Sequence, residues 1–171
     1  SFGGILIAAF NRRFPRRVSS LIFLQAVTGS GDLGPEKLQE MVRERRAQIE
    51  SMGPKDLADF RARKSLAPGA SAELVARAAE VSYSVRPKGY LQAYQAMCAA
   101  NIFEELTNIT VPALVIAGEN DSTAPRERCR SIADAIPGSR FCTIEGTGHV
   151  IYMEAPEKMN SRLAEFLTSI G

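Results

Sequence analysis

Short apolar segments alternate with helical ones at both ends of this chain, and that order limits the folds open to it. Residues 18–27, 113–117 and 141–145 are rich in β-branched and aromatic side chains, so each is predicted to be a buried strand. Helices are predicted at residues 3–14, between Pro125 and Pro137, and from Pro156 onward. This order of strands and helices is typical of a mostly parallel sheet in an α/β fold.

The middle of the chain has a different character. Residues 30–109 are predicted to be entirely helical, with breaks at Gly53, Pro68 and Pro87. We therefore expect an α/β core made of residues 1–29 and 110–171. The helical stretch is expected to be a lid inserted into that core.

Composition excludes several classes of protein. The chain has 171 residues, 45% of them hydrophobic, and a net charge of +2, which fits one globular domain with its own core. No apolar run approaches the ~20 residues of a membrane span, so no membrane partner is expected. The arginine pairs at 12–13 and 16–17 are attributed to a solvated helix end and strand entry, not to nucleic-acid binding. Three cysteines, an odd number, favour free thiols and the cytoplasm.

Ser1 is the first candidate functional residue. It stands directly before the first predicted helix, followed by Phe2, Gly3 and Gly4. Small neighbours allow a tight turn there, and the beginning of a helix favours developing negative charge. A serine before a helix is also commonly no more than its cap, so this segment alone is weak evidence.

Asp121 and His149 are the other candidates, and each follows a predicted strand. Polar groups at the carboxyl ends of parallel strands gather at one edge of the sheet. Asp121 could there orient an imidazole, although it could also cap the helix that begins near Pro125, and Glu119 is a nearby substitute. His149 is the single histidine and lies in a glycine-containing loop, where a purely structural role is its main alternative.

The order serine, aspartate, histidine decides between these alternatives, because it is the order used by α/β-hydrolases. SFGGILIAAFNRRFPRRVSSLIFL resembles the nucleophile turn, helix and next strand of that superfamily, VPALVIAGENDSTAP resembles its acid-bearing strand, and GTGHVIYMEAPEKMNSRLAEFL resembles its histidine loop and last helix. The chain is thus similar to the C-terminal part of an α/β-hydrolase. RPKGYLQAYQAMCAANIFEELTNITVPALVIAG is similar to the branch of 3-oxoadipate enol-lactonases, esterases and cofactor-free haloperoxidases.

The resemblance implies a serine hydrolase that cleaves a small carboxylic ester or lactone through an acyl-enzyme. It implies Ser1 as nucleophile, His149 as general base, Asp121 as the acid of the triad, and the Phe2 backbone N–H as an oxyanion-hole donor. No metal or cofactor is implied. The side chains expected to contact the substrate are those of Tyr90, Tyr94, Met97 and Val150, with packing as the alternative for the first three.

Several alternatives stay open on the sequence alone. The same fold hosts C–C bond hydrolases, acyltransferases and non-catalytic binding proteins. An N-terminal nucleophile hydrolase, which would use the Ser1 amine as its base, is disfavoured because it requires antiparallel sheets. A homo-oligomer is compatible with the sequence.

The beginning of the chain carries a further expectation. The first ten residues are almost wholly apolar, which is typical of the middle of a core and not of a free end. The strands that precede the nucleophile in the family are therefore expected on a separate or unnumbered N-terminal segment of about 90 to 110 residues, which would also be a partner of this chain.

Overall fold

A computed structural model describes residues 1–171 and divides them into two compact units. The first unit consists of residues 1–28, 65–69 and 102–171, and the second of residues 29–64 and 70–101. All three strands belong to the first unit. No helix of the chain combines the length and the apolar character needed to cross a membrane.

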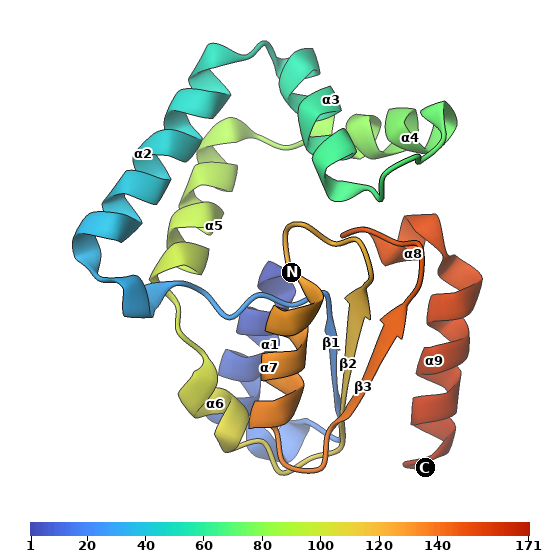
Figure 1. The fold of residues 1–171 in the computed structure, drawn as a ribbon. Helices are drawn as coiled ribbons and strands as arrows, with labels where there is room; N and C mark the ends of the chain where they lie inside the picture. The colour runs from blue at the N-terminus through green and yellow to red at the C-terminus, as the bar shows by residue number, and fades with distance from the viewer. The chain divides into compact units, whose positions relative to one another are not determined.

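The first unit is built on a three-stranded parallel sheet. β1 (Leu21–Leu24), β2 (Ala113–Gly118) and β3 (Arg140–Ile144) lie in the order β1-β2-β3, with β2 in the middle (Figure 1). Phe23 pairs with Val115, and Val115 with Phe141. Every residue of β2 is buried, as expected for the central strand of a sheet covered on both faces. The predicted α/β class with a parallel sheet is confirmed.

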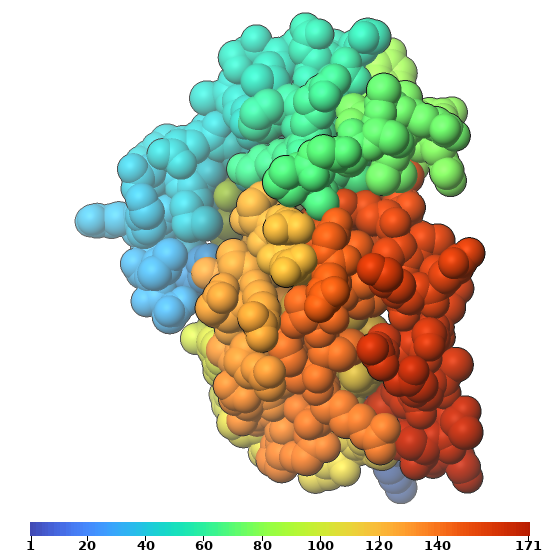
Figure 2. Space-filling view, turned by 45° about the vertical axis from the view of Figure 1, so that its right-hand side comes forward, coloured from blue at the N-terminus to red at the C-terminus, as the bar shows by residue number.

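Helices cover both faces of this sheet. α1 (Phe2–Arg13) and α7 (Arg126–Ala135) lie on one face, and α9 (Pro156–Thr168) on the other, where it forms the surface at the red end of the colour scale (Figures 1 and 2). α6 (Phe103–Thr107) packs against α1 and α7. The core under α9 is formed by buried side chains of β2, β3, α8 (Ile151–Glu154) and α9 itself: Leu114, Ile116, Ile144, Ile151 and Phe166.

Two local expectations differ from the structure. The first strand is shorter than residues 18–27, because pairing with β2 begins only at Leu21, opposite Ala113, and Gln25 takes a positive φ of 47° that ends the ladder. The first ten residues, whose apolar character is typical of the middle of a core, are also not buried on every side of α1. Its small residues Gly4 and Ala8 face the interior, and Leu6 and Phe10 are exposed.

The second unit contains four helices: α2 (Pro35–Ser51), α3 (Pro54–Ser65), α4 (Ala72–Tyr83) and α5 (Pro87–Ala99). Its two ends are joined by backbone bonds, since the N–H of Ser30 donates to the Cys98 carbonyl (3.1 Å) and that of Gly31 to the Ala100 carbonyl (2.8 Å). Gly29 sits at this crossing with φ of 87°, and a Cβ there would meet the Ala100 carbonyl oxygen at 1.9 Å. Only glycine fits that approach.

The edges of the second unit do not coincide with the predicted insertion of residues 30–109. Residues 102–109 belong to the first unit, because Leu106 and Ile109 are fully buried there and α6 contacts α1 and α7. Residues 65–69 also belong to the first unit: the Ser65 carbonyl accepts from the His149 N–H, and the Ala67 N–H donates to Glu154 on α8.

Candidate active site

The carboxyl ends of the three strands carry the candidate catalytic residues. Ser1 lies beside the carboxyl end of β1: its backbone nitrogen donates to the Leu24 carbonyl (2.9 Å), and its carbonyl accepts from the Val27 N–H (3.4 Å). Asp121 comes three residues after β2, and His149 five residues after β3. Figure 1 shows the start of the chain at the end of the sheet to which the strand arrows point.

Asp121 is held by its own turn. Its Oδ1 accepts from the backbone N–H groups of Thr123 (2.7 Å) and Ala124 (2.9 Å), and its side chain is 0% exposed. It does not cap α7, whose first residue follows Pro125. Because both backbone donors act on Oδ1, the other carboxylate oxygen is free to face a different partner.

That partner is His149. Nδ1 of the imidazole lies 2.7 Å from Oδ2 of Asp121, and the histidine side chain is 12% exposed. Donation of the Nδ1 proton to the carboxylate leaves Nε2 unprotonated and able to act as a base. Glu119, the alternative carboxylate, instead accepts from the backbone N–H of Gly146 through Oε2 (2.8 Å). The structure thus joins His149 to Asp121 and not to Glu119.

Ser1 occupies the N-cap position of α1 and its residue is exposed. Its side chain makes no capping bond to the helix, so the hydroxyl is not used as a cap. Gly4 allows the close packing below it, because a Cβ at that position would lie 2.5 Å from the Cβ of Ala26. Gly3 has open space around it, so contact does not require glycine there. The Phe2 N–H is one of the first amides of the helix, which have no partner within the helix itself.

Cys129 on α7 is another potential nucleophile of the first unit, and its thiol is buried. Burial raises the pKa of the Cys129 thiol to about 11, with a further contribution from Asp121. Cys129 is therefore a neutral thiol near pH 7, its Sγ lying 3.6 Å from the Ala124 carbonyl and 3.8 Å from that of Ala26. Ser1 is the stronger candidate for a nucleophile at this edge.

Sequence reasoning missed the residues that hold the loop between β3 and α8, residues 145–150, which carries His149 and is called the histidine loop below. Gln25 is buried and donates from Nε2 to the Gly148 carbonyl. Glu154 accepts from the N–H of Gly148 (2.9 Å) and from that of Ala67 (2.7 Å). The one available signal was Gln25 itself, a polar residue at the end of an otherwise apolar run.

The expected substrate-contacting residues lie in both units. Val150 directly follows His149 and is half-buried. Tyr90, Tyr94 and Met97 lie on α5 of the second unit, where the two tyrosine rings stack with centroids 6.2 Å apart. Arg61 lies over the Tyr90 ring at 4.0 Å, and Arg45 over the Tyr94 ring at 4.7 Å.

Tyr90 also lines a pocket of about 340 Å³ inside the second unit. Its walls combine apolar side chains with two arginines and no acidic residue, and they include Ile49, Met52, Leu57, Arg61, Tyr83 and Arg86. Tyr94 and Met97 do not line it.

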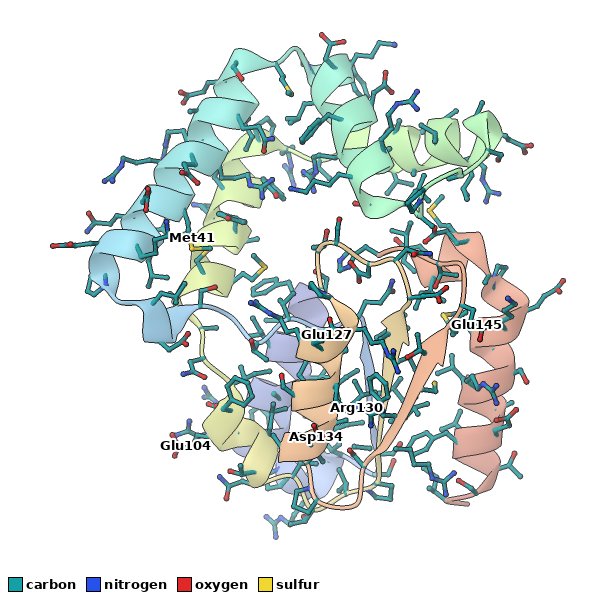
Figure 3. The ribbon with its side chains drawn as sticks, viewed as in Figure 1. Met41, Glu104, Glu127, Arg130, Asp134 and Glu145 are labelled. Atoms are coloured by element: carbon teal, nitrogen blue, oxygen red, sulfur yellow. The ribbon has the colours of Figure 1, made fainter.

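The charged residues of the first unit that Figure 3 labels are not among the candidate catalytic residues. Glu127, Arg130 and Asp134 lie on α7, and Glu145 lies in the turn after β3 (Figure 3). Arg130 packs its guanidinium 3.8 Å from the centre of the Phe141 ring. Nowhere in the chain do three His, Cys, Asp or Glu side chains gather as the ligands of a metal ion would.

Comparison with known proteins gives the family. The sequence pattern of the family described as alpha/beta hydrolase fold matches residues 1–156. A Mycobacterium tuberculosis protein named as a non-heme bromoperoxidase, BpoC, is 36% identical over 63 residues, which are 37% of this chain and 24% of that protein.

Two solved structures resemble nearly the whole chain. An esterase from Thermogutta terrifontis has a TM-score of 0.84 at 24% identity, covering 98% of this chain and 62% of its own. The enol-lactonase from Burkholderia xenovorans LB400 has a TM-score of 0.81 at 25% identity, covering 98% of this chain and 63% of its own. The chain thus spans somewhat less than two thirds of the length of these proteins. The chain belongs to the α/β-hydrolase fold family, as its sequence motifs indicated.

Proposed function

We propose that this chain supplies the catalytic triad of a serine hydrolase that cleaves a small carboxylic ester or lactone. Ser1 is the nucleophile, His149 the general base and Asp121 the acid that orients it. The observation that carries this proposal is the hydrogen bond of 2.7 Å between His149 Nδ1 and the buried Asp121 carboxylate, at the edge of the sheet where Ser1 begins α1.

The reaction follows from these groups. His149 Nε2 takes the proton of the Ser1 hydroxyl as Oγ attacks the carbonyl carbon, and the carbonyl oxygen becomes an oxyanion. When that oxyanion collapses, the C–O bond to the alcohol breaks and His149 returns the proton to the departing oxygen. Water, deprotonated by His149, then attacks the ester on Ser1; the bond from the acyl carbon to Oγ breaks, His149 returns the proton to Oγ, and the acid is released. For a lactone, the alcohol and the acid are the two ends of one product.

The Phe2 backbone N–H is the proposed donor to the oxyanion. It lies at the N-terminal end of α1, where the helix dipole favours negative charge. One such donor typically contributes about 3 kcal/mol to transition-state stabilisation. The amide is already fixed by the helix, so little reorganisation accompanies the reaction.

The substrate class rests on the relatives and on the expected binding residues. The likeness to the enol-lactonase favours an ester or lactone over other acyl compounds. Tyr90, Tyr94 and Met97, within a helical lid, and Val150, beside the base, are proposed to contact the acyl part. Their aromatic and thioether surfaces suit an apolar group.

Hydrolysis of a panel of p-nitrophenyl esters and small lactones tests this function. The complete protein is expected to turn over short esters or lactones, and Ser1→Ala is expected to lower kcat by about 10⁶-fold, because the attacking oxygen is gone. Ser161→Ala, which removes an exposed hydroxyl on α9, serves as the matched control and should keep parent activity. Inactivity of the parent on the whole panel, or undiminished turnover by Ser1→Ala, contradicts the proposal.

A further inference from the structure

The backbone of the histidine loop forms hydrogen bonds to several other segments of the first unit. The N–H of His149 donates to the Ser65 carbonyl (2.6 Å), the N–H of Gly148 donates to Glu154, and the Gly148 carbonyl accepts from Gln25. The loop is also anchored at its beginning, where the Asn120 N–H donates to the Thr147 carbonyl (2.8 Å). The position of the imidazole is therefore set by its neighbours as much as by Asp121.

The Glu154 side chain links this loop to residues 65–67. Its Oε2 accepts from Gly148 at 2.9 Å and its Oε1 from Ala67 at 2.7 Å, so a single carboxylate joins residues 65–67 to the peptide before His149. α8 places Glu154 there, since the neighbouring Ile151 is fully buried in the core. The direct bond from the His149 N–H to the Ser65 carbonyl and the two bonds to the Glu154 carboxylate together form a clamp that holds residues 65–67 against Gly148 and His149.

The close approach of residues 65–67 leaves no room for a side chain at Gly148. A Cβ on Gly148 would lie 2.6 Å from the Ala67 nitrogen and 2.7 Å from the Ser65 oxygen, both of which are backbone atoms. Leu66 and Ala67 are buried, which holds their side of the contact in place. A shift of residues 65–67 would therefore have to be followed by Gly148 and His149.

We propose that Glu154 is a positioning residue for the general base, His149, through its two hydrogen bonds to Gly148 and Ala67. It touches neither Asp121 nor Ser1 and acts by keeping the main chain of His149 fixed, so that Nδ1 stays on Asp121 and Nε2 stays directed for proton transfer. The inference deepens the proposed function and rests on it. Misplacement of a reacting group by about 1 Å is enough to lower the rate of the chemical step roughly 10²-fold.

The chemistry of the two partners gives a specific test. Both are N–H donors, so both carboxylate oxygens must accept. Glutamine has the same shape but only one accepting oxygen, and its NH₂ group would face an N–H. Aspartate keeps both acceptors on a shorter side chain. A positioning role therefore predicts that Glu154→Asp retains more activity than Glu154→Gln, although glutamine is the closer match in size.

Glu154→Gln in the complete protein is expected to lower kcat roughly 10- to 100-fold, with KM within about threefold of the parent. Glu154→Asp should recover part of this loss. Glu165→Gln is the matched control, because Glu165 is exposed and pairs only with Arg162 and Ser161 on α9; it should behave as the parent. All assays are run well below the melting temperature of each variant.

A second readout does not depend on activity. His149 is the single histidine of these 171 residues, and in the complete protein its downfield imidazole N–H proton resonance is assigned as the one lost in His149→Ala. Glu154→Gln should shift or broaden this resonance, and Glu165→Gln should not. If Glu154→Gln fails to fold, Glu154→Asp is tested in its place. It is expected to lower kcat by less than the 10- to 100-fold expected for Glu154→Gln, to leave KM unchanged, and to shift the His149 resonance.

The inference is overturned if the variant that carries the test keeps kcat within twofold of the parent. It is also overturned if the Glu154→Gln and Glu154→Asp losses are equal and follow only the melting temperature, with the His149 resonance unchanged. A parent protein without ester or lactone hydrolysis counts against the proposed function instead, and the resonance still decides whether Glu154 positions His149.

Discussion

Replacing Asp121 by asparagine is expected to lower kcat for ester hydrolysis by about 10⁴-fold without unfolding the protein. The backbone N–H groups of Thr123 and Ala124 both require an acceptor, so the asparagine oxygen would take the position of Oδ1. Its NH₂ group would then face His149 Nδ1 and donate to it. That bond fixes the tautomer with the proton on Nε2, which can no longer accept the proton of the serine hydroxyl.

Asp134→Asn is the matched control for this change, because Asp134 is an exposed carboxylate on α7. It is expected to stay within twofold of the parent in kcat and melting temperature. An Asp121→Asn protein with kcat within tenfold of the parent would contradict the assigned role of Asp121, as would an equal loss in the control.

Gly118→Ala is expected to damage both stability and catalysis. Gly118 ends β2, and a Cβ at this position would lie 2.2 Å from the Gly148 carbonyl oxygen and 2.9 Å from that of Thr147. Both are backbone atoms, so either the strand or the histidine loop must move. Overpacking of this kind typically lowers the free energy of unfolding by about 1 to 3 kcal/mol. We expect kcat to fall at least about tenfold as well, because the displaced peptide precedes His149.

Gly89→Ala is the control for Gly118→Ala. Gly89 lies in α5, and a Cβ added there would have no neighbouring atom within 4 Å. Alanine should therefore leave the free energy of unfolding unchanged or raise it by up to about 1 kcal/mol. Chemical denaturation measures both variants. A Gly118→Ala protein as stable and as active as the parent would show that the histidine loop can shift at no cost.

The strands and helices that position the site could be predicted from the sequence, because their signals lie in neighbouring residues. Residues 113–117 were expected as a strand and the structure has Ala113–Gly118, because a continuous apolar run ending in glycine fits only a buried central strand. The last helix begins at Pro156, as expected from the preference of proline for the first helical turn. Asp121 and His149 also follow the strands predicted before them.

The parts that were missed depend on contacts between distant residues. Gln25 leaves the strand conformation with φ of 47°, and its side chain reaches Gly148, 123 positions along the chain. The bonds from Ala67 to Glu154 and from His149 to Ser65 join segments more than 80 residues apart. Hydrophobic periodicity carries no information on such pairs. In the sequence, Glu154 cannot be distinguished from a solvent-exposed glutamate, because only the folded structure brings Ala67 and Gly148 to it.

Covalent labelling tests the central assignment most directly. The complete protein is treated with a fluorophosphonate probe, digested, and the adduct is located by mass spectrometry. The account predicts one adduct, on Ser1, that is absent in Ser1→Ala and forms much more slowly in Asp121→Asn, because the serine is activated through His149 and Asp121. An adduct on another residue, or labelling that persists in Ser1→Ala, would contradict it.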